Sequence, residues 1–222
     1  FAVRDKSDFR MEIGHESPKQ KIGDITKDKT SLDFAGEGEV LSLSILPNVD
    51  LDVQYLYSDN NGKWLAVDRT SDGSVLNIKA DFNYYEERTA SIILSDKLNR
   101  TDPVTINVKQ SQSRFRQGLV KLYDALDGPN WTNADGWCTE ASINDWNGID
   151  VREVDGKMEG TIDLQIMSLK GQIPDCFEYL SEILTDFTIN QGPNKETESR
   201  CLSGTLPPSF AKCTRLRSLS IS

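Results

Sequence analysis

Residues 88–110 read RTASIILSDKLNRTDPVTINVKQ, and in two runs of this stretch every second position is apolar. The runs are residues 90–94 and 104–108, and the turn-forming residues 99–103 stand between them. Alternation of this kind is what a strand with one buried face requires, because successive side chains point to opposite sides of a sheet. The pattern therefore predicts two neighbouring strands joined by a turn.

The same two-residue period extends through the first half of the chain. Apolar residues occupy alternate positions in residues 41–45, 51–57 and 76–80, with Asn, Asp, Gly and Pro between the runs. Short strands at this spacing, with no helical segment among them, predict an antiparallel β-sandwich over residues 24–112. Residues 1–23 are polar and show no period, so we expect a tether or a lead-in strand there.

Several short motifs occur in this half in a fixed order. They are TSLDF at 30–34, GEG at 36–38, WLAV at 64–67, RTASI at 88–92 and TINVKQ at 105–110. Together they resemble the BACON domain, an immunoglobulin-like β-sandwich of Bacteroidetes that often precedes other extracellular modules. The resemblance implies binding of carbohydrate such as mucin glycans, or a spacer that holds another module away from the cell.

Aromatic side chains in the first half are the candidate sugar platforms. Tyr84 and Tyr85 fall in the polar loop 81–87, where a large aromatic has no evident packing partner. A ring exposed there would stack on a sugar; the alternative is a ring packed against a neighbouring loop. Trp64 opens an apolar strand, so we expect it to be buried.

After residue 112 the period changes from two to 3.6. Phe115, Leu119 and Leu122 fall on one helical stripe, which stops at Gly128-Pro129. This change predicts two separable units joined near residues 111–113, with few core contacts between them. Three tryptophans follow, at positions 131, 137 and 146. With the glycines between them, they resemble the N-terminal cap of leucine-rich-repeat proteins, placed at residues 113–150, and the resemblance implies that they form its core.

Residues 151–222 contain a pattern that recurs. IDL at 162–164 and LKGQIP at 169–174 return as FTI at 187–189 and LSGTLP at 202–207. The pattern resembles plant-like leucine-rich repeats that are incomplete at the C-terminus, with an insertion around 191–200. The predicted fold class is therefore multi-domain: an all-β immunoglobulin-like sandwich followed by the start of an α/β leucine-rich-repeat solenoid with a helical N-terminal cap.

The repeat pattern places the candidate ligand-binding surface. Its apolar residues point inward, so the residues between and beside them face solvent. The candidate residues are Asp163, Gln165, Asp186 and Thr188, in rows that Thr161, Asn190, Ser218, Ser220 and Ser222 continue. All are polar and none is aromatic, so this surface suits a polar protein partner better than a sugar ring.

Four cysteines lie in the second half, at positions 138, 176, 201 and 213. The resemblance places Cys138 in the cap and Cys176 in the first repeat beneath it, so a disulfide between them would join the two. Cys201 is a competing partner, and buried free thiols are the alternative to disulfides. None of the four forms a CxxC pair, so a zinc site has little support.

The composition disfavours several functional classes. Thirty-five acids against 25 bases give a net charge of −10, which opposes binding to nucleic acid. No apolar run approaches the roughly 20 residues of a membrane-spanning helix. The single histidine, His15, lies in the polar N-terminal region, so nucleophilic triads lack a base. We expect neither an enzyme nor a cofactor or metal site.

Three functions remain. The first is a secreted or cell-surface binding protein whose solenoid contacts a protein or glycoprotein, with the sandwich as spacer. The second is carbohydrate binding by the sandwich, and the third is a purely structural spacer. The resemblance to BACON implies a location outside the cell or on the outer membrane, with a lipid anchor as one means of attachment. The signal segment for export is not in this chain.

Overall fold

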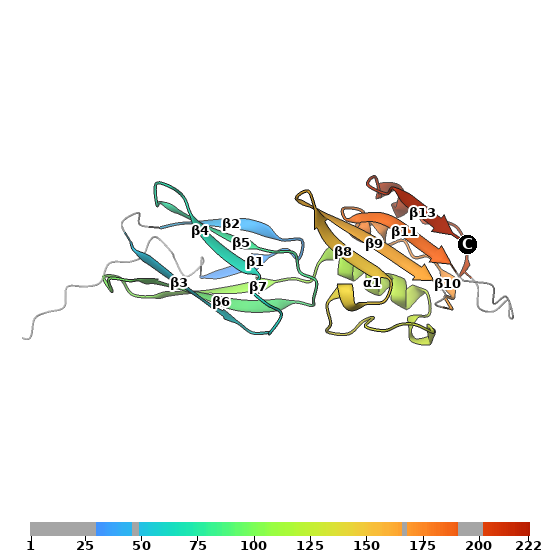
Figure 1. The fold of residues 1–222 in the computed structure, drawn as a ribbon, viewed down its shortest axis with the longest axis horizontal. Coiled ribbons are helices and arrows are strands. Elements are labelled where there is room, and N and C mark those ends of the chain that lie inside the picture. The colour runs from blue at the N-terminus through green and yellow to red at the C-terminus, as the bar shows by residue number, and fades with distance from the viewer. Residues whose placement is uncertain (1–29, 46–48, 166–167, 191–201) are drawn as a thin grey trace, which may run out of the picture.

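The computed structural model describes residues 30–45, 49–165, 168–190 and 202–222. Figure 1 shows two parts arranged end to end along the long axis: a β-sandwich, and a sheet accompanied by helix α1. The described strands are β1 (Ser31–Phe34), β2 (Glu39–Ser44), β3 (Leu51–Tyr57), β4 (Leu65–Arg69), β5 (Val75–Ala80), β6 (Arg88–Asp96), β7 (Val104–Gln110), β8 (Ile149–Val154), β9 (Lys157–Gln165), β10 (Gly171–Gln172), β11 (Leu184–Asn190), β12 (Leu202–Ser203) and β13 (Ser218–Ile221). The described α-helices are α1 (Arg114–Ala125) and α2 (Phe177–Leu180).

Two sheets that share one apolar core form the first part. One has the strand order β1-β7-β6-β3 and the other β2-β5-β4. Alternate residues of each strand point into the core: in β5, Leu76, Ile78 and Ala80 are buried, whereas Asn77 and Lys79 are not. A fully buried aliphatic side chain contributes about 1.5–3 kcal/mol to the stability of the fold relative to an exposed one, so these core side chains hold the two sheets together.

The second part is built on a sheet of order β13-β11-β9-β8. Strands β9, β11 and β13 run parallel to one another, and β8 pairs antiparallel with β9. One side of this sheet is apolar, with Ile162, Leu164, Phe187 and Ile189 fully buried. A second, two-stranded parallel ladder joins β10 to β12.

Helix α1 and a tryptophan cluster complete the second core. The helix begins after Ser113, whose side chain accepts a hydrogen bond from the Arg116 backbone N–H at 3.3 Å. Its stripe of Phe115, Leu119 and Leu122 is buried in the same cluster as the apolar side of the sheet. Trp131, Trp137 and Trp146 are also buried there, with neighbouring ring centroids 4.9 Å and 5.1 Å apart.

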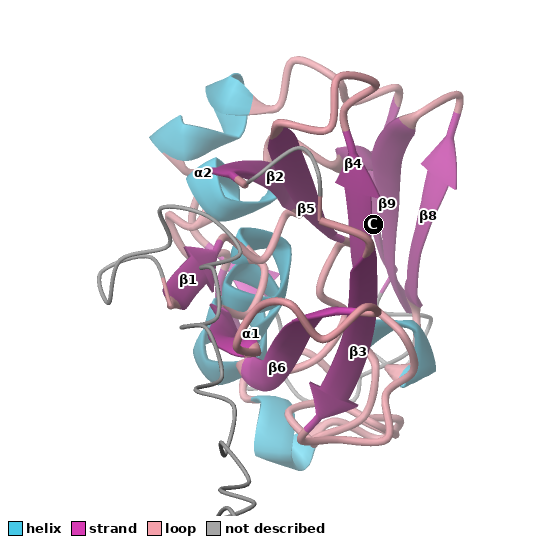
Figure 2. Cartoon of the chain, turned by 90° about the vertical axis from the view of Figure 1, so that its left-hand side faces the viewer, coloured by secondary structure: helices cyan, strands magenta, loops and turns pink. Residues whose placement is uncertain are grey.

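The prediction of an α/β leucine-rich-repeat solenoid with a helical cap is wrong. The regular secondary structure of the described residues is mostly strand, in several small sheets, and α2 has only four residues (Figure 2). A solenoid is a series of units that each bury their apolar face on the next unit. Here one core cluster takes up the apolar side of β9 and β11 together with α1 and the tryptophans. An alternating apolar pattern fixes one buried side of a sheet, and it does not specify stacked repeats.

The two parts meet in a packed junction, where few core contacts were expected. Phe82, which follows β5 of the sandwich, is buried in the core cluster of the second part. The ring of Tyr84 packs edge to face on Phe82, with centroids 4.8 Å apart. The backbone N–H of Ile143 donates to the Tyr84 carbonyl at 2.9 Å. The loop at 81–87 therefore belongs structurally to both parts.

Gly36 allows the sandwich to approach the start of α1. A Cβ atom at this position would lie 2.3 Å from the Ser113 nitrogen and 2.4 Å from the Gln112 carbonyl carbon. Contacts this short with backbone atoms exclude any side chain. Next to it, the Glu37 carboxylate accepts a hydrogen bond from the Arg114 backbone N–H at 2.5 Å. These contacts fix how the sandwich sits on the second part.

Some expectations fall on residues outside the described ranges. They are the N-terminal tether or lead-in strand at 1–23, the insertion at 191–200, and Cys201.

Candidate functional site

The exposed side of the β9–β11–β13 sheet forms a continuous polar surface. Strand register places Asp186 between Thr161 and Ser218, and Thr188 between Asp163 and Ser220. Gln165 lies across from Asn190 at the end of the same strands. We call this surface the polar sheet face, defined as Thr161, Asp163, Gln165, Asp186, Thr188, Asn190, Ser218 and Ser220. The four sequence-predicted residues Asp163, Gln165, Asp186 and Thr188 thus lie together.

The strand pattern explains why these residues share one side. Ile162, Leu164, Phe187 and Ile189 alternate with them along β9 and β11 and are fully buried on the other side. Side chains on neighbouring strands at the same register level stand about 5 Å apart, so the polar groups form rows across the sheet. The surface therefore offers a regular array of hydroxyl, amide and carboxylate groups.

Charges at one end of the polar sheet face are paired with each other. The Arg217 guanidinium donates to Glu159 at 2.8 Å and 3.2 Å and reaches Asp186 at 3.5 Å. These acids raise the pKa of Arg217 above its ordinary value, chiefly through the hydrogen bonds that the guanidinium donates to Glu159. On the neighbouring strand β8, Arg152 pairs with Asp150 at 3.4 Å. The carboxylates at this end already have cationic partners.

Asp163 differs from those carboxylates. Its Oδ2 accepts a hydrogen bond from Gln165 Nε2 at 2.8 Å. Its Oδ1 is shielded from solvent, and the described part of the chain provides it with no hydrogen-bond donor. Within that part, no Lys or Arg forms an ion pair with Asp163. An acceptor without a partner is costly to shield from water, so a donor from a binding partner would stabilise it.

Tyr84 and Tyr85 occupy a different place from the polar sheet face. Both are half-buried, and Tyr84 lines a groove of about 690 Å³ at the junction, together with Glu153 of β8 and Met158 of β9. Burial, and next the negative charge of Glu153, raise the pKa of Tyr84. The packing against Phe82 described above shows that tertiary contacts hold this ring. Tyr84 thus adopts the packed alternative, and a sugar-binding role for Tyr84 and Tyr85 stays a prediction.

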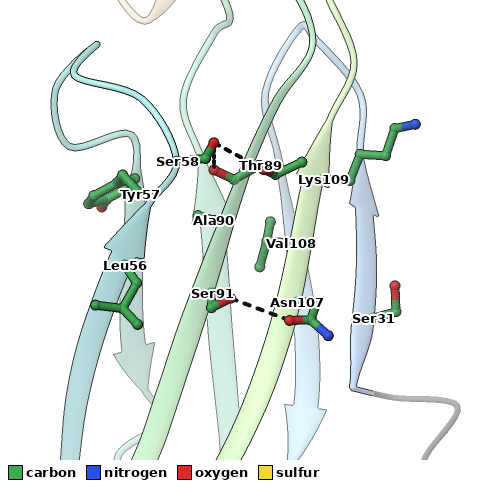
Figure 3. A pocket seen from close by; sticks show the side chains of 10 residues that line it. All are labelled: Ser31, Leu56, Tyr57, Ser58, Thr89, Ala90, Ser91, Asn107, Val108 and Lys109. Atoms are coloured by element: carbon green, nitrogen blue, oxygen red, sulfur yellow. Dashed lines mark hydrogen bonds between the residues drawn. The ribbon is translucent and has the colours of Figure 1, made fainter.

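A shallow pocket of about 400 Å³ lies on the sandwich, over strands β1, β7, β6 and β3 (Figure 3). Its polar lining comes from outward-facing residues, which are linked by hydrogen bonds drawn in the figure. Ser58 Oγ donates to the Thr89 carbonyl at 2.7 Å, and Ser91 Oγ donates to Asn107 Oδ1 at 3.3 Å. Beside them lies the apolar side chain of Leu56, which is 57% exposed. Hydroxyl and amide groups next to an exposed apolar side chain suit a neutral polyhydroxylated ligand.

The two-residue period of the sequence contains a signal for this pocket. Ser91 and Asn107 alternate with the buried residues Ile92, Ile106 and Val108, so their outward position was readable from the two-residue period. Among the aromatic side chains of the sandwich, Trp64 is buried as expected, and its ring centroid lies 4.4 Å from the guanidinium carbon of Arg88.

The structure does not join Cys138 to Cys176. Cys138 is an exposed free thiol, whereas Cys176 and Cys213 are buried free thiols. The Cys176 thiol faces the Gly118 carbonyl of α1 at 3.8 Å, and burial raises its pKa to about 12. The predicted disulfide between Cys138 and Cys176 is therefore absent from this structure.

Two further features concern the described residues only. Among them, no helix is both long enough and apolar enough to cross a membrane. The same residues contain no group of three or more His, Cys, Asp or Glu side chains placed to hold a metal ion.

No protein-family model and no curated protein matches the chain. Solved structures give partial matches. A GH5 xyloglucanase from Bacteroides ovatus is 20% identical over 39% of this chain and 18% of that chain, with a TM-score of 0.31. The cysteine protease inhibitor EhICP2 from Entamoeba histolytica is 9% identical over 37% of this chain and 84% of its own, with a TM-score of 0.27. A chain of the ZIG-8–RIG-5 IG1–IG1 heterodimer is 10% identical over 46% of this chain and 89% of its own, also with a TM-score of 0.27.

These similarities are too low to support an inference about fold or function. The functional hypotheses therefore rest on the two surfaces themselves. The polar sheet face presents ordered donors and acceptors, with one carboxylate, Asp163, that has no cationic partner among the described residues. The sandwich pocket presents hydroxyl and amide groups beside Leu56.

Proposed function

We propose that this chain is a non-catalytic binding protein whose polar sheet face engages a protein or glycoprotein partner. The observation that carries the proposal is the register of β9, β11 and β13, which aligns eight polar side chains into rows on one exposed side. A flat array of this kind matches the extended surface of a protein better than a small molecule, which needs a concave site.

Asp163 defines the chemistry of the partner. Because its carboxylate has no cationic partner among the described residues, the partner supplies a Lys or Arg at this point. The overall charge of −10 adds a long-range attraction for such a basic surface and speeds its approach at low salt. The polar sheet face has no aromatic anchor, so we expect modest affinity.

The sandwich acts in this proposal as a spacer with a fixed orientation. Phe82 and Gly36 pack it against the second part, so it does not swing as a module on a flexible linker. This role fits the resemblance of residues 24–112 to the BACON domain. A location outside the cell or on the outer membrane is part of the same proposal.

A second candidate function is glycan binding by the sandwich pocket. The observation in its favour is the hydrogen-bonded set around Ser91 and Asn107 next to the exposed Leu56 (Figure 3). A sugar would exchange hydrogen bonds with the hydroxyl and amide groups and place a C–H face on Leu56.

Binding measurements with one variant on each surface separate these two functions. The probes are a panel of purified extracellular proteins, a mucin, the same mucin stripped of its O-glycans, and a glycan array. Asp163→Lys places a like charge against the basic residue of the partner, so we expect its affinity for a protein to fall about tenfold or more. Asn107→Ala removes one pocket amide and should weaken only glycan binding.

Each variant is the control for the other, and circular dichroism checks that both are folded. Protein ligands that bind folded Asp163→Lys as tightly as the unmodified chain would contradict the assignment of the polar sheet face. Loss of mucin binding after removal of the glycans, together with sensitivity to Asn107→Ala, would transfer the function to the sandwich pocket.

A further inference from the structure

A groove lies at the junction of the two parts. It is the groove of about 690 Å³ that Tyr84 lines, where the β8–β9 hairpin stands next to the sandwich (Figure 1). Its lining residues fall within 37–40 and 79–84 of the sandwich and within 153–158 of the hairpin. We call it the junction groove.

The junction groove is separate from the polar sheet face. Strand register pairs Glu153 of β8 with Met158 of β9, so their side chains share one side of the sheet. Met158 and Ile162 are an even number of residues apart on β9 and face the core side, whereas Thr161 and Asp163 face the other side. The junction groove and the polar sheet face therefore have no residue in common.

Part of the groove lining is apolar and open to solvent. Val40 of β2 is 54% exposed. Tyr84 and Met158 are only partly buried against the second core, so each leaves part of its side chain in the groove. The hydroxyl group of Tyr84 forms no hydrogen bond with any other residue that the structure describes. An occupant would cover apolar surface here and could exchange a hydrogen bond with this hydroxyl.

The rest of the lining is strongly acidic. It contains four carboxylates and one cation, namely Glu37, Glu39, Asp81, Glu153 and Lys79. Lys79 pairs with Asp81 at 3.2 Å. Within the described ranges, no Lys or Arg forms an ion pair with any of the three glutamates. Uncompensated negative charge next to an apolar surface suits a cationic ligand that has a hydrocarbon stem.

Two of these glutamates are held in place by the backbone. The Glu37 carboxylate accepts a hydrogen bond from the Arg114 backbone N–H at 2.5 Å. The Glu39 carboxylate accepts one from the Ala35 backbone N–H at 2.7 Å. Side chains that are already ordered lose little conformational entropy when a ligand binds, so more of the pairing energy appears as affinity.

We propose that the junction groove binds a basic peptide segment of another protein and receives an arginine side chain from it. The hydrocarbon stem of an arginine can cover Val40 and Met158, while its guanidinium pairs with Glu153 and stacks on the ring of Tyr84. A peptide is favoured over a small cation, because the carboxylates stand on both parts of the chain and an extended segment reaches them together. The proposal does not depend on the function proposed for the polar sheet face.

Fluorescence anisotropy with the full 222-residue chain tests the proposal. The probe is a fluorescein-labelled pentapeptide in which valine alternates with arginine, and the control peptide has glutamine in place of arginine. At low salt the arginine peptide should bind about tenfold or more tightly than the glutamine peptide, and added salt should weaken its binding. Agmatine, a small guanidinium compound, should displace the probe only at a much higher concentration than the unlabelled peptide does.

Variants of Glu153 locate the binding site. Glu153→Lys sets an ammonium group in the junction groove and should raise the dissociation constant of the arginine peptide about tenfold or more. Glu153→Gln only removes the charge and should raise it about threefold. Asp124→Lys is the matched control, because it makes the same change of net charge at an exposed position near the far end of α1, outside the groove lining. It should change the dissociation constant less than about twofold, and circular dichroism checks that all variants are folded.

Any of four results overturns the proposal. The first is no binding of the arginine peptide at low salt up to about 1 mM. The second is equal weakening by Glu153→Lys and Asp124→Lys, which would mean that overall charge alone attracts the peptide. The third is agmatine binding as tight as that of the peptide, which would assign the groove to a small cation. The fourth is binding that Asp163→Lys weakens and Glu153→Lys does not, which would move the peptide to the polar sheet face and support the function proposed there.

Discussion

Replacing Phe82 by alanine tests whether the two parts fold as one unit. Phe82 belongs to the sandwich by sequence but lies in the core cluster of the second part. Phe→Ala substitutions in a core cost about 3–5 kcal/mol, because they remove apolar contact and leave a cavity. The cavity at Phe82 cannot collapse easily, since the backbone bond between Ile143 and Tyr84 holds the loop in place. We therefore expect Phe82→Ala to lower the free energy of unfolding by about 4 kcal/mol.

Tryptophan fluorescence during thermal unfolding measures the effect of Phe82→Ala on the second part. In a Trp64→Phe background the remaining tryptophans, 131, 137 and 146, all report on the second part. A loss of about 4 kcal/mol lowers the melting temperature of a chain of this size by about 8–16 °C. The control is Leu98→Ala in the same background. Leu98 is a sandwich side chain that is 63% exposed, so its removal should change the free energy of unfolding by no more than about 0.5 kcal/mol.

The reasoning fails if Phe82→Ala leaves the fluorescence transition where it was. A loss confined to the sandwich, seen by far-ultraviolet circular dichroism alone, would mean that Phe82 supports only the part from which it comes. The residues 111–113 would then be a boundary between independent units, as the change of hydrophobic period had indicated.

Three further outcomes are expected. Arg116→Met removes a buried guanidinium that donates to two backbone carbonyls, so thermal unfolding should show a loss of about 1–3 kcal/mol. Hydrogen bonds from Arg100 hold the pKa of Asp96 well below its usual range, so the stability that Asp96 contributes is present above the unfolded-state pKa and disappears as the pH falls below about 4. Asp96→Asn should therefore be less stable than the unmodified chain at neutral pH. The free energies of unfolding of the two, measured by urea titration, should converge in acid, and a difference that does not change with pH would refute the pKa assignment. Iodoacetamide should label Cys138 in the native chain and leave Cys176 unlabelled until unfolding, as peptide mass spectrometry would show, and a mapped disulfide between them would contradict the structure.

The sequence was informative where one side of a strand is buried. The alternation at 76–80 correctly predicted Leu76, Ile78 and Ala80 in the core, because alternate residues of a strand face the same side of the sheet and the apolar set faces the core. The same rule brought Asp163 and Thr188 onto one surface, because neighbouring parallel strands in register align alternate residues. Local periodicity is enough for such predictions.

Long-range packing was not accessible in the same way. The recurring motifs at 162–164 and 187–189 indicated which side of β9 and β11 is apolar. Helix α1 and the tryptophans share the core with that side. The spacing of residues along the sequence does not reveal that these elements meet. Phe82 and Tyr84 lie in a loop, and their packing was not readable from the sequence, because Ile143 and the core cluster that they join come from a segment far along the chain. Within the described ranges, Arg217 and Arg152 pair with other carboxylates and not with Asp163, which the spacing along the sequence does not reveal.

The packed junction has a consequence for avidity. Phe82 and Gly36 hold the sandwich pocket and the polar sheet face at one separation and one relative orientation. A ligand with two epitopes at the matching spacing would bind the second site at a high effective concentration, because no linker entropy is lost. A ligand with any other spacing would gain nothing from the second site. If both proposed surfaces bind, the packed junction would favour ligands whose two epitopes stand at the distance that it sets.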